Sequence, residues 1–189
     1  MGNARTWLYR VMVLLVIALM IVSWLLPWWR AVIIAIDNYV QIRPWGLETD
    51  LGTYASYISA GQMPGWFAPF MWAYLGIAVL AALVSLFLKD KAFKILKFKF
   101  NLPTFITGMV GVSYIVVAIV FLIFAAIRTG DFYGIHLIGH SFFTLEHPVE
   151  SDVEAKLLLG FWLVCATGPL FVILSLLRNK ITGKKEISA

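Results

Sequence analysis

The residues whose types and spacing could support chemistry gather in one segment, residues 128–156. All three histidines of the chain lie there, at His136, His140 and His147. Asp131 is close enough in sequence to act as a further ligand. Imidazole groups together with a carboxylate suit copper, zinc or non-haem iron. The segment therefore contains a candidate metal site, with copper or another transition metal as the cofactor it would hold.

Two interpretations of this histidine cluster follow from the local sequence. His136 and His140 have the spacing that would place both rings on one face of a helix. Gly134 and Gly139 disfavour a helix there, and the chain has no established metal-binding signature such as HExxH. On the alternative interpretation, the rings lie at a membrane surface with their polar tips among the lipid headgroups. Both interpretations remain open from the sequence.

The composition indicates what kind of structure must position such a site. Of the 189 residues, 61% are hydrophobic and only 13% are charged, whereas an ordinary soluble domain has about 25% charged residues. This imbalance excludes a water-soluble globular domain and a disordered chain. The single cysteine, Cys165, excludes an intramolecular disulfide.

Four uncharged stretches are long enough to cross a bilayer, which takes about 20 mostly apolar residues. Each is expected to be a helix, because lipid offers no partners for open backbone groups. The predicted spans cover residues 11–29, 65–88, 105–127 and 157–177. We therefore expect an all-α integral membrane protein with one four-helix domain over residues 1–189. Its connections would be two structured outer loops, 30–64 and 128–156, and a cytoplasmic loop, 89–104.

The outer loops contain local strand signals. Residues 31–42 are rich in β-branched side chains, a composition typical of a strand or of an interfacial segment. The sequence that follows, from Arg43 to Gly52, supplies turn residues and three charges. For residues 146–154 the sequence leaves open whether the acidic stretch is extended or helical.

The basic residues assign an orientation to these spans. Eleven of the fifteen lysines and arginines fall in the two terminal tails and the loop 89–104. By the positive-inside rule, both termini and this loop are expected on the cytoplasmic side of the cell membrane. The sequence pI of about 9.4 thus reports topology, and no nucleic-acid partner is needed to explain it.

The first outer loop carries a family-like motif. A tryptophan stands near the outer end of the first span, and the loop contains Trp45, Gly46 and Leu47 in succession. In these features the chain resembles the claudin and peripheral-myelin-protein group of four-span membrane proteins. Those proteins have a pair of cysteines in the same loop, and this loop has none. The resemblance covers the first two spans, and we infer no function from it.

Two kinds of residue are expected to make contacts. Aromatic side chains in and beside the outer loops would pack on the helix ends or on another subunit. Glycines in the third span have the small-residue spacing that lets helices approach closely in lipid. The residues predicted to make these interactions are Trp28, Trp29, Trp45, Trp66, Gly108 and Gly111.

The leading functional hypothesis is a non-catalytic integral membrane subunit, a scaffold within a larger complex. The predicted spans contain no charged residue and no histidine, whereas ion pathways and proton relays usually need such groups. Membrane lipids and other integral membrane subunits are the expected partners. One alternative is a metal-binding redox subunit of a respiratory or oxygenase complex that uses the outer-loop histidines. A further alternative is an oligomeric pore or carrier.

Overall fold

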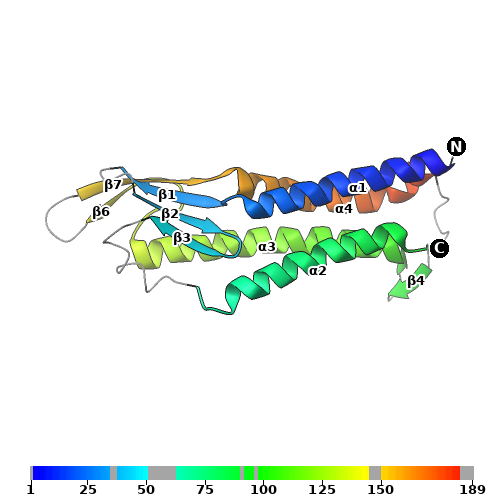
Figure 1. Cartoon of the computed structure of the whole chain (residues 1–189), viewed down its shortest axis with the longest axis horizontal. Coiled ribbons are helices and arrows are strands. Elements are labelled where there is room, and N and C mark those ends of the chain that lie inside the picture. The colour runs from blue at the N-terminus through cyan, green and yellow to red at the C-terminus, as the bar shows by residue number, and fades with distance from the viewer. Residues whose placement is uncertain are drawn as a thin grey trace. The chain divides into compact units, whose positions relative to one another are not determined.

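The computed structural model describes residues 2–34, 38–50, 63–89, 92–95, 98–144 and 150–183. The described part of the chain forms four helices and seven strands (Figure 1). In chain order these elements are α1 (Gly2–Leu25), β1 (Trp29–Ile33), β2 (Asn38–Arg43), β3 (Gly46–Asp50), α2 (Phe67–Phe87), β4 (Ala92–Ile95), β5 (Phe98–Asn101), α3 (Leu102–Tyr133), β6 (Gly139–Thr144), β7 (Glu150–Leu157) and α4 (Leu159–Thr182).

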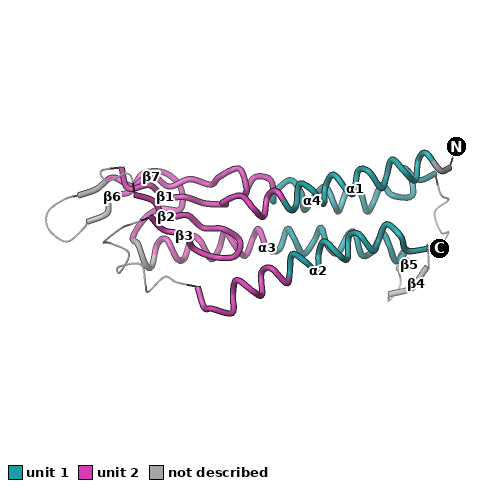
Figure 2. The backbone as a smooth tube through the Cα atoms, viewed as in Figure 1, with its two compact units in different colours: residues 1–21, 74–116, 164–189 teal, residues 22–73, 117–163 magenta. Residues whose placement is uncertain are grey.

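The chain divides into two compact units, which Figure 2 shows in different colours. Unit 1 contains residues 1–21, 74–116 and 164–189, and therefore most of α1, α2 and α4 together with the first half of α3. Unit 2 contains residues 22–73 and 117–163. It includes β1–β3, β6 and β7, and the helix segments that lead into them.

The expectation of an all-α protein is wrong, because unit 2 contains a five-stranded antiparallel sheet. Its strand order is β3-β2-β1-β7-β6. The β-branched stretch after the first span becomes β1 and β2, and the turn between Arg43 and Gly46 leads into β3. The acidic stretch of the second outer loop is extended from Glu150 onward, where it forms β7. Strand pairing joins residues far apart in sequence, as between Trp29 and Leu157, and span prediction does not detect such pairing.

Four helices are long and apolar enough to cross a membrane: Ala4–Leu25, Phe67–Phe87, Leu102–Gly130 and Leu159–Thr182. They match the four predicted spans in number and order but differ in their ends. The first predicted span continues to Trp29, whereas α1 ends at Leu25 and Trp29 already belongs to β1. Hydropathy alone placed the end of the first span too late, because the apolar residues Trp28 and Trp29 follow the helix directly. Helices α3 and α4 are longer than their predicted spans because their terminal turns contain polar residues.

The core of unit 2 lies between one face of the sheet and α3. Trp29, Ala31, Val153 and Ala155 are buried there together with Ala125 of α3. The indole N–H of Trp29 donates a 2.7 Å hydrogen bond to the Leu137 carbonyl. Aromatic burial with a satisfied N–H therefore fixes the central strand to its helix.

In unit 1, small residues allow helices α3 and α4 to pack closely together. A Cβ atom on Gly111 of α3 would lie 2.8 Å from the Gly168 carbonyl oxygen and 2.8 Å from Phe171 Cβ, both in α4. A Cβ on Gly108 would lie 2.9 Å from the Ser175 hydroxyl. Both glycines predicted as contact residues thus lie where α3 approaches α4 within this chain.

We expect Gly111→Ala to destabilise the protein by about 1–3 kcal/mol, the usual cost of overpacking, because the opposing carbonyl belongs to the backbone and cannot rotate away. The measurement is the apparent melting temperature in detergent. Gly76→Ala is the matched control, since a Cβ there meets nothing within 4 Å. Equal melting temperatures for the two variants would contradict the close approach of α3 and α4.

Candidate functional site

The sheet of unit 2 has a core face and a polar face, because successive side chains along a strand alternate. The polar face is formed by the side chains that alternate with the buried ones on each strand. Its polar residues are Arg30 on β1, Tyr39, Gln41 and Arg43 on β2, Glu48 and Asp50 on β3, His140 on β6, and Asp152, Glu154 and Lys156 on β7. Most of the charged side chains of unit 2 in the described residues are on this face.

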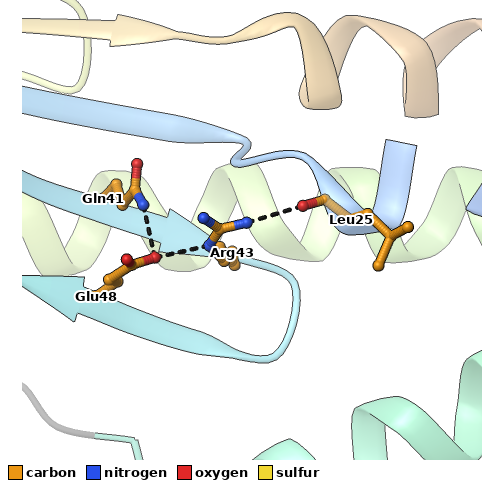
Figure 3. Close-up of polar contacts among 4 residues, drawn as sticks. All are labelled: Leu25, Gln41, Arg43 and Glu48. Carbon is orange, nitrogen blue, oxygen red and sulfur yellow. Dashed lines mark hydrogen bonds and ion pairs between the residues drawn. The ribbon is translucent and has the colours of Figure 1, made fainter. Parts of the chain in front are cut away.

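A hydrogen-bonded group on the polar face holds β2 and β3 to the end of α1 (Figure 3). Arg43 Nε donates to Glu48 Oε2 at 2.8 Å, and Arg43 Nη1 donates to the Leu25 carbonyl at 2.8 Å. Gln41 Nε2 donates to the same carboxylate oxygen at 2.6 Å. The last carbonyls of a helix lack partners within the helix, and Arg43 supplies a donor to one of them. Its positive charge also interacts favourably with the negative end of the helix dipole.

These hydrogen bonds also change the acidity of Glu48. The hydrogen bonds from Arg43 and then from Gln41 stabilise the carboxylate, and they hold the pKa of Glu48 below its ordinary value. The side chain is about half exposed. Its role is therefore to fix the geometry of the hairpin and not to exchange protons near neutral pH.

The predicted aromatic contact residues fall into two groups. Trp28 and Trp29 are fully buried in unit 2, and the Trp28 indole donates to the Ser23 carbonyl at 2.8 Å. Trp45 lies in the hairpin turn, 4.8 Å from the ring of Trp72 on α2 and beneath the Arg43 guanidinium. Trp66 is 65% exposed. Of the four predicted tryptophans, Trp66 thus offers the most surface to a partner.

The structure places His136 and His140 outside any helix, with His140 on β6. Gly134 and Gly139 have positive φ angles of 61° and 101°, and His136 lies in the non-helical link between α3 and β6. The one-face helical geometry that the spacing suggested is therefore wrong, because the two glycines direct the chain out of the helix and into a strand. Only the backbone of Asp131 is described, and His147 lies outside the described residues.

His140 has a carboxylate neighbour that the sequence did not point to. Its Nδ1 lies 3.2 Å from Asp152 Oδ2 across the β6–β7 pair, and both side chains are exposed. His136 donates its backbone N–H to the Ser141 hydroxyl at 2.8 Å. An imidazole and a carboxylate are two of the ligands that a transition metal needs. Within the described residues no group of three His, Cys, Asp or Glu side chains could hold a metal ion.

Unit 1 contains a buried polar cluster, of which the sequence indicated Thr107 and Ser175 as polar residues within the spans but not their association with Arg178. Its side chains are Tyr9, Ser85, Thr107, Ser175 and Arg178, one or more from each helix. Ser85 and Thr107 hydroxyls lie 3.0 Å apart, and Ser175 donates to the Thr104 carbonyl at 2.9 Å. The predicted fourth span ends at residue 177, which leaves Arg178 among the basic residues of the C-terminal tail. The spacing of Ser175, Arg178 and Thr182 on one helix face was the signal that could have identified it.

No protein-family model matches the sequence, and no curated protein matches it either. Function must therefore be inferred from the contacts and surfaces described above.

The lowered pKa of Glu48 predicts a pH dependence of stability. A carboxyl whose pKa is depressed by folding contributes stability above its unfolded pKa, and that contribution disappears as the pH falls through the folded pKa. We expect the melting temperature to fall as the pH drops below the ordinary pKa of a glutamate side chain, and Glu48→Gln to reduce this fall. Asp50→Asn, on the same strand, is the control. An identical pH profile for wild-type protein and Glu48→Gln would contradict the stabilised carboxylate.

The metal hypothesis predicts that stoichiometric metal depends on the histidines. Protein isolated from its native membrane should then hold about one transition-metal ion per chain, and His136→Ala with His140→Ala should lose it because a site needs at least three ligands. Elemental analysis of the purified chain measures this. A His147→Ala variant tests the third predicted ligand. Unmutated protein without metal would remove the hypothesis.

Proposed function

We propose that this chain is an integral membrane protein that serves as a non-catalytic subunit of a larger membrane complex. The membrane assignment is supported by the apolar surface of the helices. Between 22% and 44% of the most apolar stretch of each helix is buried in the chain itself. The rest exposes leucine, isoleucine, valine and phenylalanine side chains, a surface too large and continuous for a protein in water.

The proposed orientation follows from residues at the two sets of helix ends. Arg5, Arg10 and Lys180 lie at the first turns of α1 and the last turn of α4, as expected for cytoplasmic ends. Exposed tryptophans lie at the other ends, with Trp66 and Trp72 at the start of α2 and Trp162 at the start of α4. Tryptophan is enriched where the bilayer meets water. The sheet would then lie on the outer side of the membrane.

The subunit role is supported by the two edge strands of the sheet, beyond which the described residues form no further strand. β3 and β6 are the edge strands, and Phe142 on β6 is 74% exposed. Uncovered edges with an exposed aromatic residue readily pair with another chain, and monomeric proteins usually protect them. A non-catalytic role is supported by the polar face, where Arg43, Glu48 and Gln41 hold secondary structure together.

The test is isolation from the native membrane in mild detergent, with mass spectrometry of everything that accompanies the chain. We expect stoichiometric companions, and we expect Phe142→Ser to weaken their retention severalfold, because removing one exposed aromatic anchor at an interface typically costs about 1–2 kcal/mol. Ile34→Ser is the matched control, since Ile34 is an exposed apolar residue that follows the central strand.

The opposite outcomes separate the alternatives. A chain that is isolated alone contradicts the subunit proposal. A chain isolated only with copies of itself would instead favour the oligomeric pore or carrier. If Phe142→Ser retains its companion proteins and Ile34→Ser loses them, the contact surface is not at the β6 edge.

A further inference from the structure

The polar face has a row of side chains close to the point where the sheet joins the helices. Strand register places Arg30 of β1 directly between Lys156 of β7 and Gln41 of β2. Residues paired in this way point to the same side of a sheet. Arg30 and Lys156 therefore stand side by side, and like charges in directly opposed positions destabilise a sheet. Such a cost is offset when an anion binds between the two charges.

The guanidinium of Arg30 is held in place without a carboxylate. It lies 4.2 Å from the centroid of the Tyr39 ring, which fixes its flat face by a cation–π contact. Its Nε–H group is buried and has no acceptor among the described residues. Within the same described residues Arg30 takes part in no ion pair. A buried donor without a partner costs free energy, and no carboxylate of the described residues neutralises the charge of Arg30.

Two of the three described carboxylates that form ion pairs on this face interact with residues other than Arg30 and Lys156. Glu48 accepts from Arg43, and Asp152 lies beside His140. Glu154 lies 3.7 Å from Lys156, and both side chains are about half exposed. An ion pair this long and this exposed contributes little, so Lys156 can also interact with another anion.

We propose that Arg30 and Lys156 bind the phosphate group of an outer-leaflet phospholipid, with a preference for anionic lipids. A planar guanidinium with several N–H groups matches a phosphate by two parallel hydrogen bonds, and a lysine adds a second positive charge. This proposal rests on the membrane placement given above. It does not depend on whether the chain is a subunit of a complex.

Arg30 and Lys156 lie close to the proposed membrane surface, and this position favours a lipid phosphate over an anion in solution. Leu159, the first residue of α4, follows Lys156 by three residues. At about 3.3 Å per extended residue, the two residues are separated by about 10 Å at most. Leu159 is exposed and apolar, and Trp162 is exposed one turn further along the helix. Long basic side chains extend back toward a membrane surface and bring their charge into the headgroup layer. Arg30 is at the same level, because its backbone pairs with that of Lys156.

The experiment reconstitutes the purified full-length chain into nanodiscs of phosphatidylcholine containing phosphatidylglycerol, and counts retained lipids by native mass spectrometry after transfer to detergent. We expect Arg30→Gln with Lys156→Gln to weaken phosphatidylglycerol retention by about thirtyfold, which corresponds to about 1 kcal/mol for each basic residue at a membrane surface. Arg30→Lys should recover part of the retention, because it restores the charge without the planar donors.

A matched control removes the same charge elsewhere. Lys89→Gln with Lys180→Gln neutralises two exposed lysines of unit 1 and should leave the tightly retained lipid in place. An equal loss in both double variants would overturn the site, since net charge alone would then explain retention. Displacement of the lipid by millimolar inorganic phosphate would also overturn it, because the site would then take a free anion.

Failure of the membrane placement has a different signature. A chain that does not float with vesicles on a density gradient contradicts the proposed function itself. If wild-type protein and both double variants float and melt alike and retain the same lipid, the phosphate site is overturned and the membrane placement stands.

Discussion

The backbone polar groups at the end of α1 impose the constraint on which unit 2 depends. Where a helix ends and a strand begins within a few residues, carbonyl and N–H groups lose their partners, and each must find another. Here Arg43 bonds to the Leu25 carbonyl. Trp28 then donates its backbone N–H to the Ile42 carbonyl and accepts from the backbone N–H of Leu158. The junction is satisfied only when β2 and the end of β7 are both in place.

The same junction explains why large and very small residues stand next to each other there. Trp28 is enclosed by the rings of Trp24, Phe121 and Phe161 at edge-to-face angles. A Cβ atom on Gly160 would lie 2.7 Å from the Pro27 carbonyl oxygen. The start of α4 can approach the end of α1 only because that position has no side chain. Aromatic packing and backbone hydrogen bonding thus reinforce each other at one place.

The sequence was sufficient for some of these features and insufficient for others, for physical reasons. Hydropathy is a local property, so four helices were predicted correctly, and the β-branched stretch 31–42 was recognised as a candidate strand. The pairing of β1 with β7 joins residues more than 100 positions apart in the sequence, and no pattern within either segment indicates it. Helix ends were misplaced where apolar tryptophans such as Trp28 continue beyond the helix, and where Arg178 extends it. The position of His140 beside Asp152 depends on strand register and could not be predicted from spacing.

The central position of β1 has a consequence for the order in which the protein is made. A ribosome delivers the chain from its N-terminus, so β1, β2 and β3 are complete long before β7 has been synthesised. Until then the edge of β1 that later pairs with β7 has unpaired backbone amide and carbonyl groups. The side chains of Trp29 and Ala31, which are buried in the complete sheet, lie on this same strand. The nascent chain therefore passes through a stage with an open central strand, and that stage is the one most exposed to mispairing with other chains.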